Sequence, residues 1–114
     1  MKVIQSDEQA TAEVHTEGAA GVTIKALLTR QDGAPGFTLR EFTVEPGGHT
    51  PRHAHAHEHE VIIRAGSGTL WSEEREWALA PGVVVLVKPD EPHQFSAGPD
   101  GLVLYCIVPH AGHQ

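Results

Sequence analysis

The decisive stretch of the chain spans residues 47–66 and reads GGHTPRHAHAHEHEVIIRAG. Every odd position from His53 to His59 is a histidine. In one straight strand these side chains would share a face, but the first and last would lie roughly 20 Å apart, at about 3.3 Å per residue. A metal–imidazole bond is only about 2.0–2.2 Å long, so a shared ion requires a turn between them. We therefore predict a turn over residues 56–58, with His57 exposed within it, and a new strand that starts at His59. On that strand His59, Val61 and Ile63 should point the same way, toward the other histidines.

A histidine-rich tract has several uses in proteins. On its own, this one also fits a solvated loop, a non-specific binding tract for transition metals or a pH-sensitive surface. A second stretch, from Gly82 to Ala97, carries His93 beside the turn residues Pro89 and Pro92. Because this histidine stands in a motif of its own, we predict one metal centre built from both stretches.

The spacing of the first stretch resembles the first motif of the cupin superfamily, G-x5-H-x-H-x3,4-E-x6-G. The match runs from Gly47 to Gly66, with His59 in the place of the glutamate. If Glu60 were the equivalent residue, the closing glycine would fall on Ser67, so the register favours His59.

The second stretch resembles the second cupin motif, G-x5-P-x-G-x2-H-x3-N. Gly82 and His93 are retained, whereas Lys88, Asp90 and Ala97 replace the proline, the glycine and the asparagine. The replaced asparagine is the residue that would support His93 from outside the metal site. Fifteen residues separate the two motifs, which is similar to the shortest spacing among microbial single-domain cupins.

More narrowly, the chain resembles small bacterial manganese cupins that hold their metal with four histidines. This resemblance rests on FTVEPGG at residues 42–48, on the histidine tract and on CIVP at residues 106–109. It implies one divalent transition metal per chain, with manganese expected first and iron, nickel, copper or zinc as alternatives. The implied ligands are His53, His55, His59 and His93.

Short β-rich runs separated by turn residues fill the chain from residue 22 onward, which predicts an all-β sandwich or barrel. The resemblance narrows this to a cupin jelly-roll barrel, also called a double-stranded β-helix. We expect a single cupin domain over residues 21–114, preceded by an extended N-terminal arm over residues 1–20. The expected strands are Val22–Arg30, Phe37–Glu45, His59–Ala65, Gly68–Ser72, Glu76–Leu79, Val83–Val87 and Leu102–Val108. The turns expected between strands include residues 66–68 and 98–101, which are rich in glycine.

Charge and composition exclude several classes of partner. Eight Lys and Arg against fifteen Asp and Glu give a formal net charge of −7, which argues against nucleic acid and anionic membranes. No apolar run approaches the roughly 18 residues that span a bilayer, and the N-terminus lacks the apolar segment of a signal peptide. Because Cys106 is the single cysteine, the chain forms no internal disulfide, and we expect a soluble cytoplasmic protein.

The strands expected at 83–87 and 102–108 are apolar on both faces, whereas a strand of an isolated antiparallel barrel has one polar face. This favours a homodimer that covers the second face, in which the arm pairs across the interface, as the resemblance also implies. Packing within one chain is the alternative.

Four neutral imidazoles leave a metal ion with its full charge, so the site should favour an anionic or enolisable small-molecule substrate. Our first interpretation is an oxidoreductase that uses oxygen or peroxide, similar to a dioxygenase. The alternatives are a non-redox metal enzyme (an isomerase, lyase or cyclase), a sensor that binds a metal or small ligand without catalysis, and a structural zinc site.

Two further residues are candidates for catalytic roles. Arg40 shares strand parity with Phe42 and Val44, so it should point into the barrel and bind a substrate carboxylate or a glutamate. Cys106 is either a small core residue or a thiol next to the metal. The larger aromatic residues are expected in the core or an interface; they are Trp71, Trp77, Phe95 and Tyr105.

Overall fold

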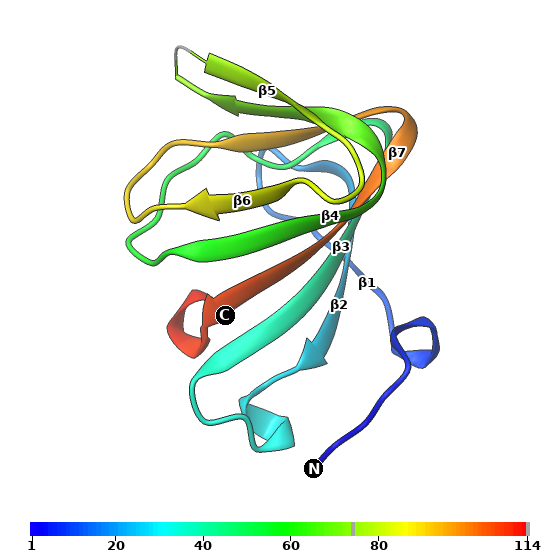
Figure 1. Cartoon of the computed structure of the whole chain (residues 1–114), viewed down its shortest axis with the longest axis vertical. Helices are drawn as coiled ribbons and strands as arrows, with labels where there is room; N and C mark the ends of the chain where they lie inside the picture. The colour runs from blue at the N-terminus through cyan, green and yellow to red at the C-terminus, as the bar shows by residue number, and fades with distance from the viewer. Residues whose placement is uncertain (74, 114) are drawn as a thin grey trace.

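A computed structural model describes residues 1–73 and 75–113 (Figure 1). The described residues form seven strands: β1 (Ala12–Glu13), β2 (Ala20–Leu28), β3 (Phe37–His49), β4 (His59–Ser72), β5 (Arg75–Leu79), β6 (Val84–Val87) and β7 (Gln94–Pro109). The same residues form three short 3-10 helices: η1 (Ser6–Glu8), η2 (Arg30–Asp32) and η3 (His110–Gly112). No helix in this part of the chain is long and apolar enough to cross a membrane. The predicted all-β fold is confirmed.

All strand pairs are antiparallel, in the order β1-β2-β3-β7-β4-β5, with β6 paired to the first part of β4. The last strand in the sequence, β7, therefore lies between β3 and β4 (Figure 1). The loop after β3 is fixed beside the start of β7, because His53 and His93 exchange two backbone hydrogen bonds of 3.2 and 2.9 Å. The Thr50 N–H also donates to the Phe95 carbonyl oxygen, at 2.9 Å.

The sequence predicted turns between strands at two places where the structure has continuous strand. Both predictions are wrong. The strands expected at 59–65 and 68–72 are two parts of β4, and the turn expected at 98–101 lies within β7. The register between β4 and β7 shifts next to Gly66, whose φ is +83°. A Cβ at this position would collide with the carbonyl oxygen of Gly101. The glycine thus allows two strand backbones to approach closely at a bulge, where we had expected a turn.

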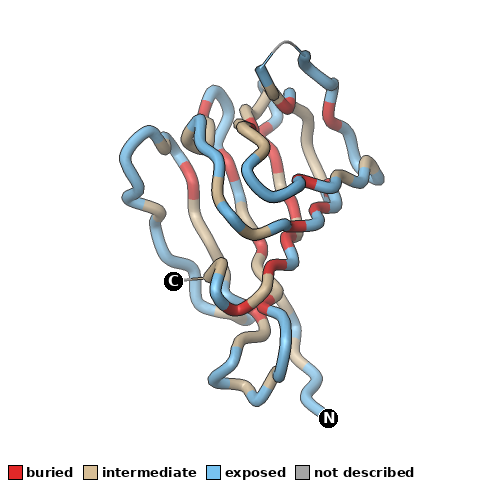
Figure 2. The backbone as a smooth tube through the Cα atoms, turned by 90° about the vertical axis from the view of Figure 1, so that its left-hand side faces the viewer, coloured by how far each residue is buried: buried red, intermediate tan, exposed pale blue. Residues whose placement is uncertain are grey.

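Alternate residues of the long strands face the interior, which Figure 2 shows as buried positions separated by exposed ones. In β4 the side chains of His59, Val61 and Ile63 are buried, and the residues between them are exposed. This confirms the parity expected for the strand. Leu104 and Cys106 of β7 are buried in the same core. The strands therefore direct the histidine at the start of β4 into the barrel.

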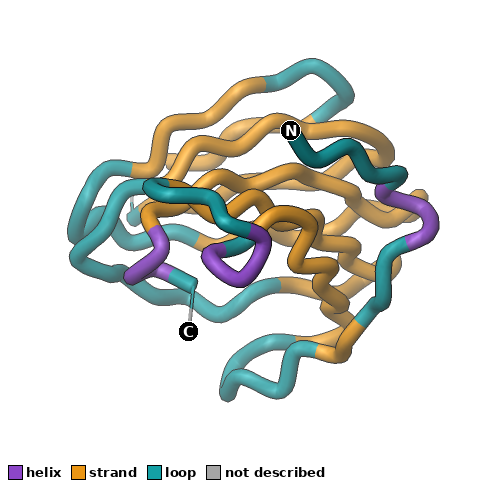
Figure 3. Tube along the Cα trace, turned by 90° about the horizontal axis from the view of Figure 1, so that it is seen from below, coloured by secondary structure: helices purple, strands orange, loops and turns teal. Residues whose placement is uncertain are grey.

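The N-terminal residues 1–20 lie against the strands of their own chain (Figure 3). They include η1 and the short β1, which pairs with β2. The Lys2 ammonium group forms an ion pair with Asp32, and Lys25 donates a 3.0 Å hydrogen bond to the Ser6 carbonyl oxygen.

The C-terminal η3 is held by a buried histidine. The His110 ring lies 2.7 Å from the Thr38 hydroxyl through Nδ1 and 2.6 Å from the Ala34 carbonyl oxygen through Nε2. These contacts fix η3 at the same end of the molecule as the loop that follows η2 (Figure 3).

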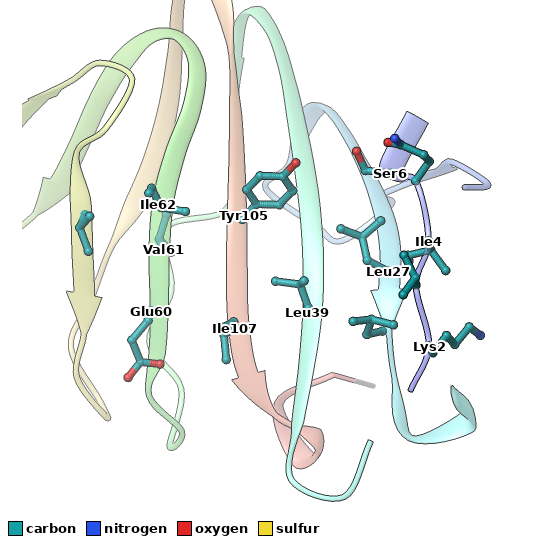
Figure 4. A pocket seen from close by; sticks show the side chains of 14 residues that line it. Lys2, Ile4, Ser6, Leu27, Leu39, Glu60, Val61, Ile62, Tyr105 and Ile107 are labelled. Atoms are coloured by element: carbon teal, nitrogen blue, oxygen red, sulfur yellow. The ribbon is translucent and has the colours of Figure 1, made fainter. Parts of the chain in front are cut away.

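The outer face of the sheet carries an apolar groove of about 700 Å³ between the N-terminal segment and β4 (Figure 4). Ile62, Tyr105 and Ile107 line the groove, with Ile4 on the N-terminal side. Ile62 and Ile107 are 44% and 42% exposed, so this face of the sheet is accessible in the single chain.

Candidate metal centre

Three of the four histidines expected as ligands form one cluster. A ring nitrogen from each of His53, His55 and His93 lies within 4.8 Å of the others. The chain bends at residues 56–57, inside the predicted turn, so the histidine tract folds back on itself. The hydrogen-bonded bridge between His53 and His93 adds the ligand from the second motif.

His59 lies directly beside this cluster. Its Nε2 atom is 3.3 Å from Nε2 of His93, and its ring centroid is 4.8 Å from that of His55. It is the first residue of β4 and is only 6% exposed, whereas Glu60 points outward. The structure therefore directs His59, and not its neighbour, toward the other imidazoles.

Backbone carbonyl groups orient two of these rings. Nδ1 of His55 donates to the His57 carbonyl oxygen at 3.0 Å, and Nδ1 of His93 donates to the Glu91 carbonyl oxygen at 2.8 Å. A carbonyl oxygen only accepts hydrogen bonds, so the proton of each neutral ring lies on Nδ1 and the Nε2 lone pair stays free. A metal-ligating histidine typically has its second nitrogen bonded in this way, so the donor set fits a transition metal. In the second cupin motif an asparagine would support this histidine, but Ala97 stands at that position here. The Glu91 carbonyl oxygen supports His93 instead.

His57 differs from the expectation that it would be exposed. It is half-buried, and its ring stacks on that of His55 with centroids 4.0 Å apart and an interplanar angle of 2°. Gly112 of η3 packs so closely on it that a Cβ there would collide with the ring. The bend at residues 56–57 places the His57 imidazole against Gly112 of η3. The local sequence pattern did not predict this contact.

Arg40 and Cys106 lie next to the cluster, as strand parity predicted for Arg40. They are directly opposite each other on β3 and β7, and Arg40 Nη2 donates to Cys106 Sγ at 3.2 Å. The same sulfur lies 3.1 Å from Nδ1 of His59. The Arg40 Nε is buried without a hydrogen-bond partner within the described residues, so one donor of this cation is free for a ligand.

The histidines open into a cavity of about 450 Å³ with largely apolar walls. Phe42, Phe95 and Leu104 form part of these walls, and His113 lies at the C-terminal side. Phe95 thus belongs to both the core and the cavity, and its ring centroid is 6.3 Å from that of His93. Sequence reasoning did not identify His113, because its position depends on how η3 folds back over the cavity.

Burial keeps His59 and His93 uncharged at neutral pH. Desolvation, together with the smaller effect of the neighbouring imidazoles His93 and His55, lowers the pKa of His59 to about 3. Desolvation also lowers the pKa of His93, although the hydrogen bond to the Glu91 backbone opposes this shift. Neutral imidazoles are the form that binds metal ions, so these rings are ready for a ligand role at neutral pH.

Comparisons with known proteins place this geometry in context. The polyketide cyclase RemF from Streptomyces resistomycificus has a similar structure, with a TM-score of 0.91, 33% identity and coverage of 96% of this chain and 80% of RemF. L-ectoine synthase from Mycobacteroides abscessus is 30% identical over 83% of this chain and 74% of the enzyme. L-ectoine synthase from Bordetella petrii is 29% identical over 73% of this chain, and the match spans 63% of that enzyme's length.

The sequence profile of the family described as Cupin domain matches residues 40–108. This range begins at Arg40, contains all four predicted ligands and ends within β7. It covers more than half of the chain, and the similar structures share the fold. The chain belongs to the cupin domain family.

Proposed function

We propose that this chain is a non-redox metal enzyme, a cyclase that closes a ring in an anionic, enolisable small molecule. The observation that carries this proposal is a cluster of imidazoles beside an arginine in an apolar-walled cavity. The residues that would hold the ion are His53, His55, His59 and His93. A divalent ion there would act as a Lewis acid on a substrate carbonyl group. Manganese is the expected ion from the sequence, and zinc suits the same role.

Arg40 would bind the charged part of the substrate. A guanidinium is permanently protonated and matches a carboxylate or enolate oxygen geometrically. Its Nη2 is bonded to Cys106, while Nε is buried and has no partner among the described residues, so a substrate oxygen would satisfy it. In a water-poor cavity such a preorganised donor stabilises developing negative charge far better than it would in solvent.

The walls of the cavity would favour ring closure. Phe42, Phe95 and Leu104 present apolar surface, which excludes water and leaves a flexible substrate few conformations. Holding two reacting groups in contact turns their encounter into an effectively unimolecular step.

An oxidoreductase that uses oxygen or peroxide is the second candidate. The named relatives favour the cyclase, because they are a polyketide cyclase and two synthases. The position of Cys106 also disfavours oxidant chemistry, since a thiol 3.1 Å from His59 would be exposed to oxidants formed at the site.

Ligand variants test the metal site. The purified protein should carry about one divalent transition metal per chain by elemental analysis. His59→Ala should lower metal affinity by more than the roughly 10–100-fold that loss of an outer partner costs. Glu60→Ala is the matched control and should keep full stoichiometry, as should His57→Ala. Metal retention in His59→Ala together with loss in Glu60→Ala would mean that the register is wrong by one residue.

Acid should destabilise the metal-free protein. A histidine whose pKa is near 6.5 unfolded and about 3 folded stabilises the fold fully above pH 6.5, and this contribution is lost as the pH falls toward 3. Chemical denaturation between pH 7.5 and 5 should show this loss. His59→Gln should reduce the slope of the unfolding free energy by up to about 1.4 kcal/mol per pH unit. His15→Gln, at an exposed histidine, should keep the wild-type dependence of the unfolding free energy on pH. If wild type, His59→Gln and His15→Gln all show the same dependence, His59 is not the group that titrates.

Oxygen dependence separates the two enzyme classes. Linear poly-β-carbonyl acids should cyclise under argon at the aerobic rate, with either zinc or manganese bound. Arg40→Met should raise KM for substrates that carry a carboxylate by about tenfold, which corresponds to about 1.4 kcal/mol. Oxygen uptake in step with product formation, or loss of turnover on zinc loading, would refute the cyclase proposal.

The exposed apolar face supports a homodimer. Val84 and Leu86 of β6 are 70% and 52% exposed, and Val84 lies directly opposite the groove residue Ile62 of β4. Exposed apolar side chains gathered beside an apolar groove are typical of an interaction surface. Light scattering should give twice the 12.3 kDa chain mass at micromolar concentration. Ile107→Lys should shift the protein to monomer, while Glu76→Lys on β5 should not. If the intact chain is monomeric at high concentration, the homodimer proposal is wrong and the groove is open to solvent.

A further inference from the structure

Three imidazoles of the metal centre have an Nδ1 hydrogen bond, and one of them has an unusual partner. His55 and His93 donate to carbonyl oxygens, which fixes their protons on Nδ1. The partner of His59 is Cys106 Sγ, at 3.1 Å. A thiol both donates and accepts, so it permits either tautomer of the His59 ring.

When no ion lies between the rings, these contacts allow one directed chain of hydrogen bonds. Nδ1 of His93 is a donor to the Glu91 carbonyl, so its Nε2 is an acceptor. Without an ion, Nε2 of His59, 3.3 Å away, would carry the proton, because two lone pairs would otherwise face each other. With that tautomer Nδ1 of His59 accepts from the Cys106 thiol, and Arg40 donates to the sulfur at 3.2 Å. Every donor in the chain finds an acceptor.

Metal binding requires the opposite tautomer. The Nε2 lone pair of His59 must be free, so the ring proton has to lie on Nδ1 and point at the sulfur. Cys106 accommodates this without leaving its place, since rotation about its Cβ–Sγ bond turns its own proton away and exposes a lone pair to Nδ1. The ring proton moves from Nε2 to Nδ1 through solvent, and the total number of protons is unchanged.

We propose that Cys106 is the positioning residue that allows His59 to exchange tautomers when the metal loads, with Arg40 fixing the sulfur from β3. This rests on the proposed metal function. The geometry is built by the fold: Cys106 is 1% exposed, directly opposite Arg40 on one side and Val61 on the other. His59 is two residues before Val61 on the same face of β4, within reach of the sulfur.

Two measurements on the full chain test the proposal. Nitrogen-15 NMR of the His59 ring should show Nε2–H in metal-free wild type and Nδ1–H after zinc loading. Zinc affinity, from competition with a chromophoric chelator, should fall by about 10–100-fold in Cys106→Ala, because the buried Nδ1–H then has no acceptor. Cys106→Ser should restore affinity to within about threefold of wild type, since a hydroxyl also donates and accepts.

A matched variant separates this effect from lost packing. Val108→Ala removes a side chain of β7 that is equally buried and faces the same core, and it should leave zinc affinity unchanged. The proposal is overturned if His59 has the same tautomer with and without zinc. It is also overturned if Cys106→Ala binds zinc within about threefold of wild type. Neither result would argue against the metal site itself. Absence of zinc binding in wild type would instead refute the proposed function itself.

Discussion

Two backbone hydrogen bonds between His53 and His93 are the constraint on which the candidate site depends. They join the loop after β3 to the start of β7, so histidines that are 40 positions apart in the sequence become neighbours. The bend at residues 56–57 then returns the chain to β4, and the inward parity of that strand adds His59. The imidazoles are thus positioned by backbone pairing, which leaves their ring nitrogens available for a ligand.

The charge of the cavity follows from this choice of side chains. A cluster made of neutral histidines contributes no negative charge, and Arg40 adds a permanent positive one. In a protein of net charge −7, this site would become strongly cationic if the proposed divalent ion were bound. The apolar walls formed by residues such as Phe42 and Leu104 keep that charge from being screened by water.

Local patterns in the sequence were sufficient for the all-β fold, the turn after His55 and the inward direction of His59, because these depend on strand period and turn chemistry. The breaks around Gly66 and residues 98–101 were misassigned, since glycine marks both turns and bulges and only the partner strand distinguishes them. The burial of His57 depends on Gly112, which is far along the chain. The contact between Cys106 and His59 likewise depends on the register between β4 and β7, which no local pattern contains.

The central place of β7 has a consequence for how the protein is made. This strand lies between β3 and β4, yet the ribosome synthesises it after both of them. Until it is inserted, both neighbouring strands present open edges, which are the sites where nascent β proteins associate wrongly. During the same interval the histidine tract is already available to metal ions without its partner from the second motif. The proposed metal centre is therefore complete only after β7 is inserted, the same event that closes the open strand edges.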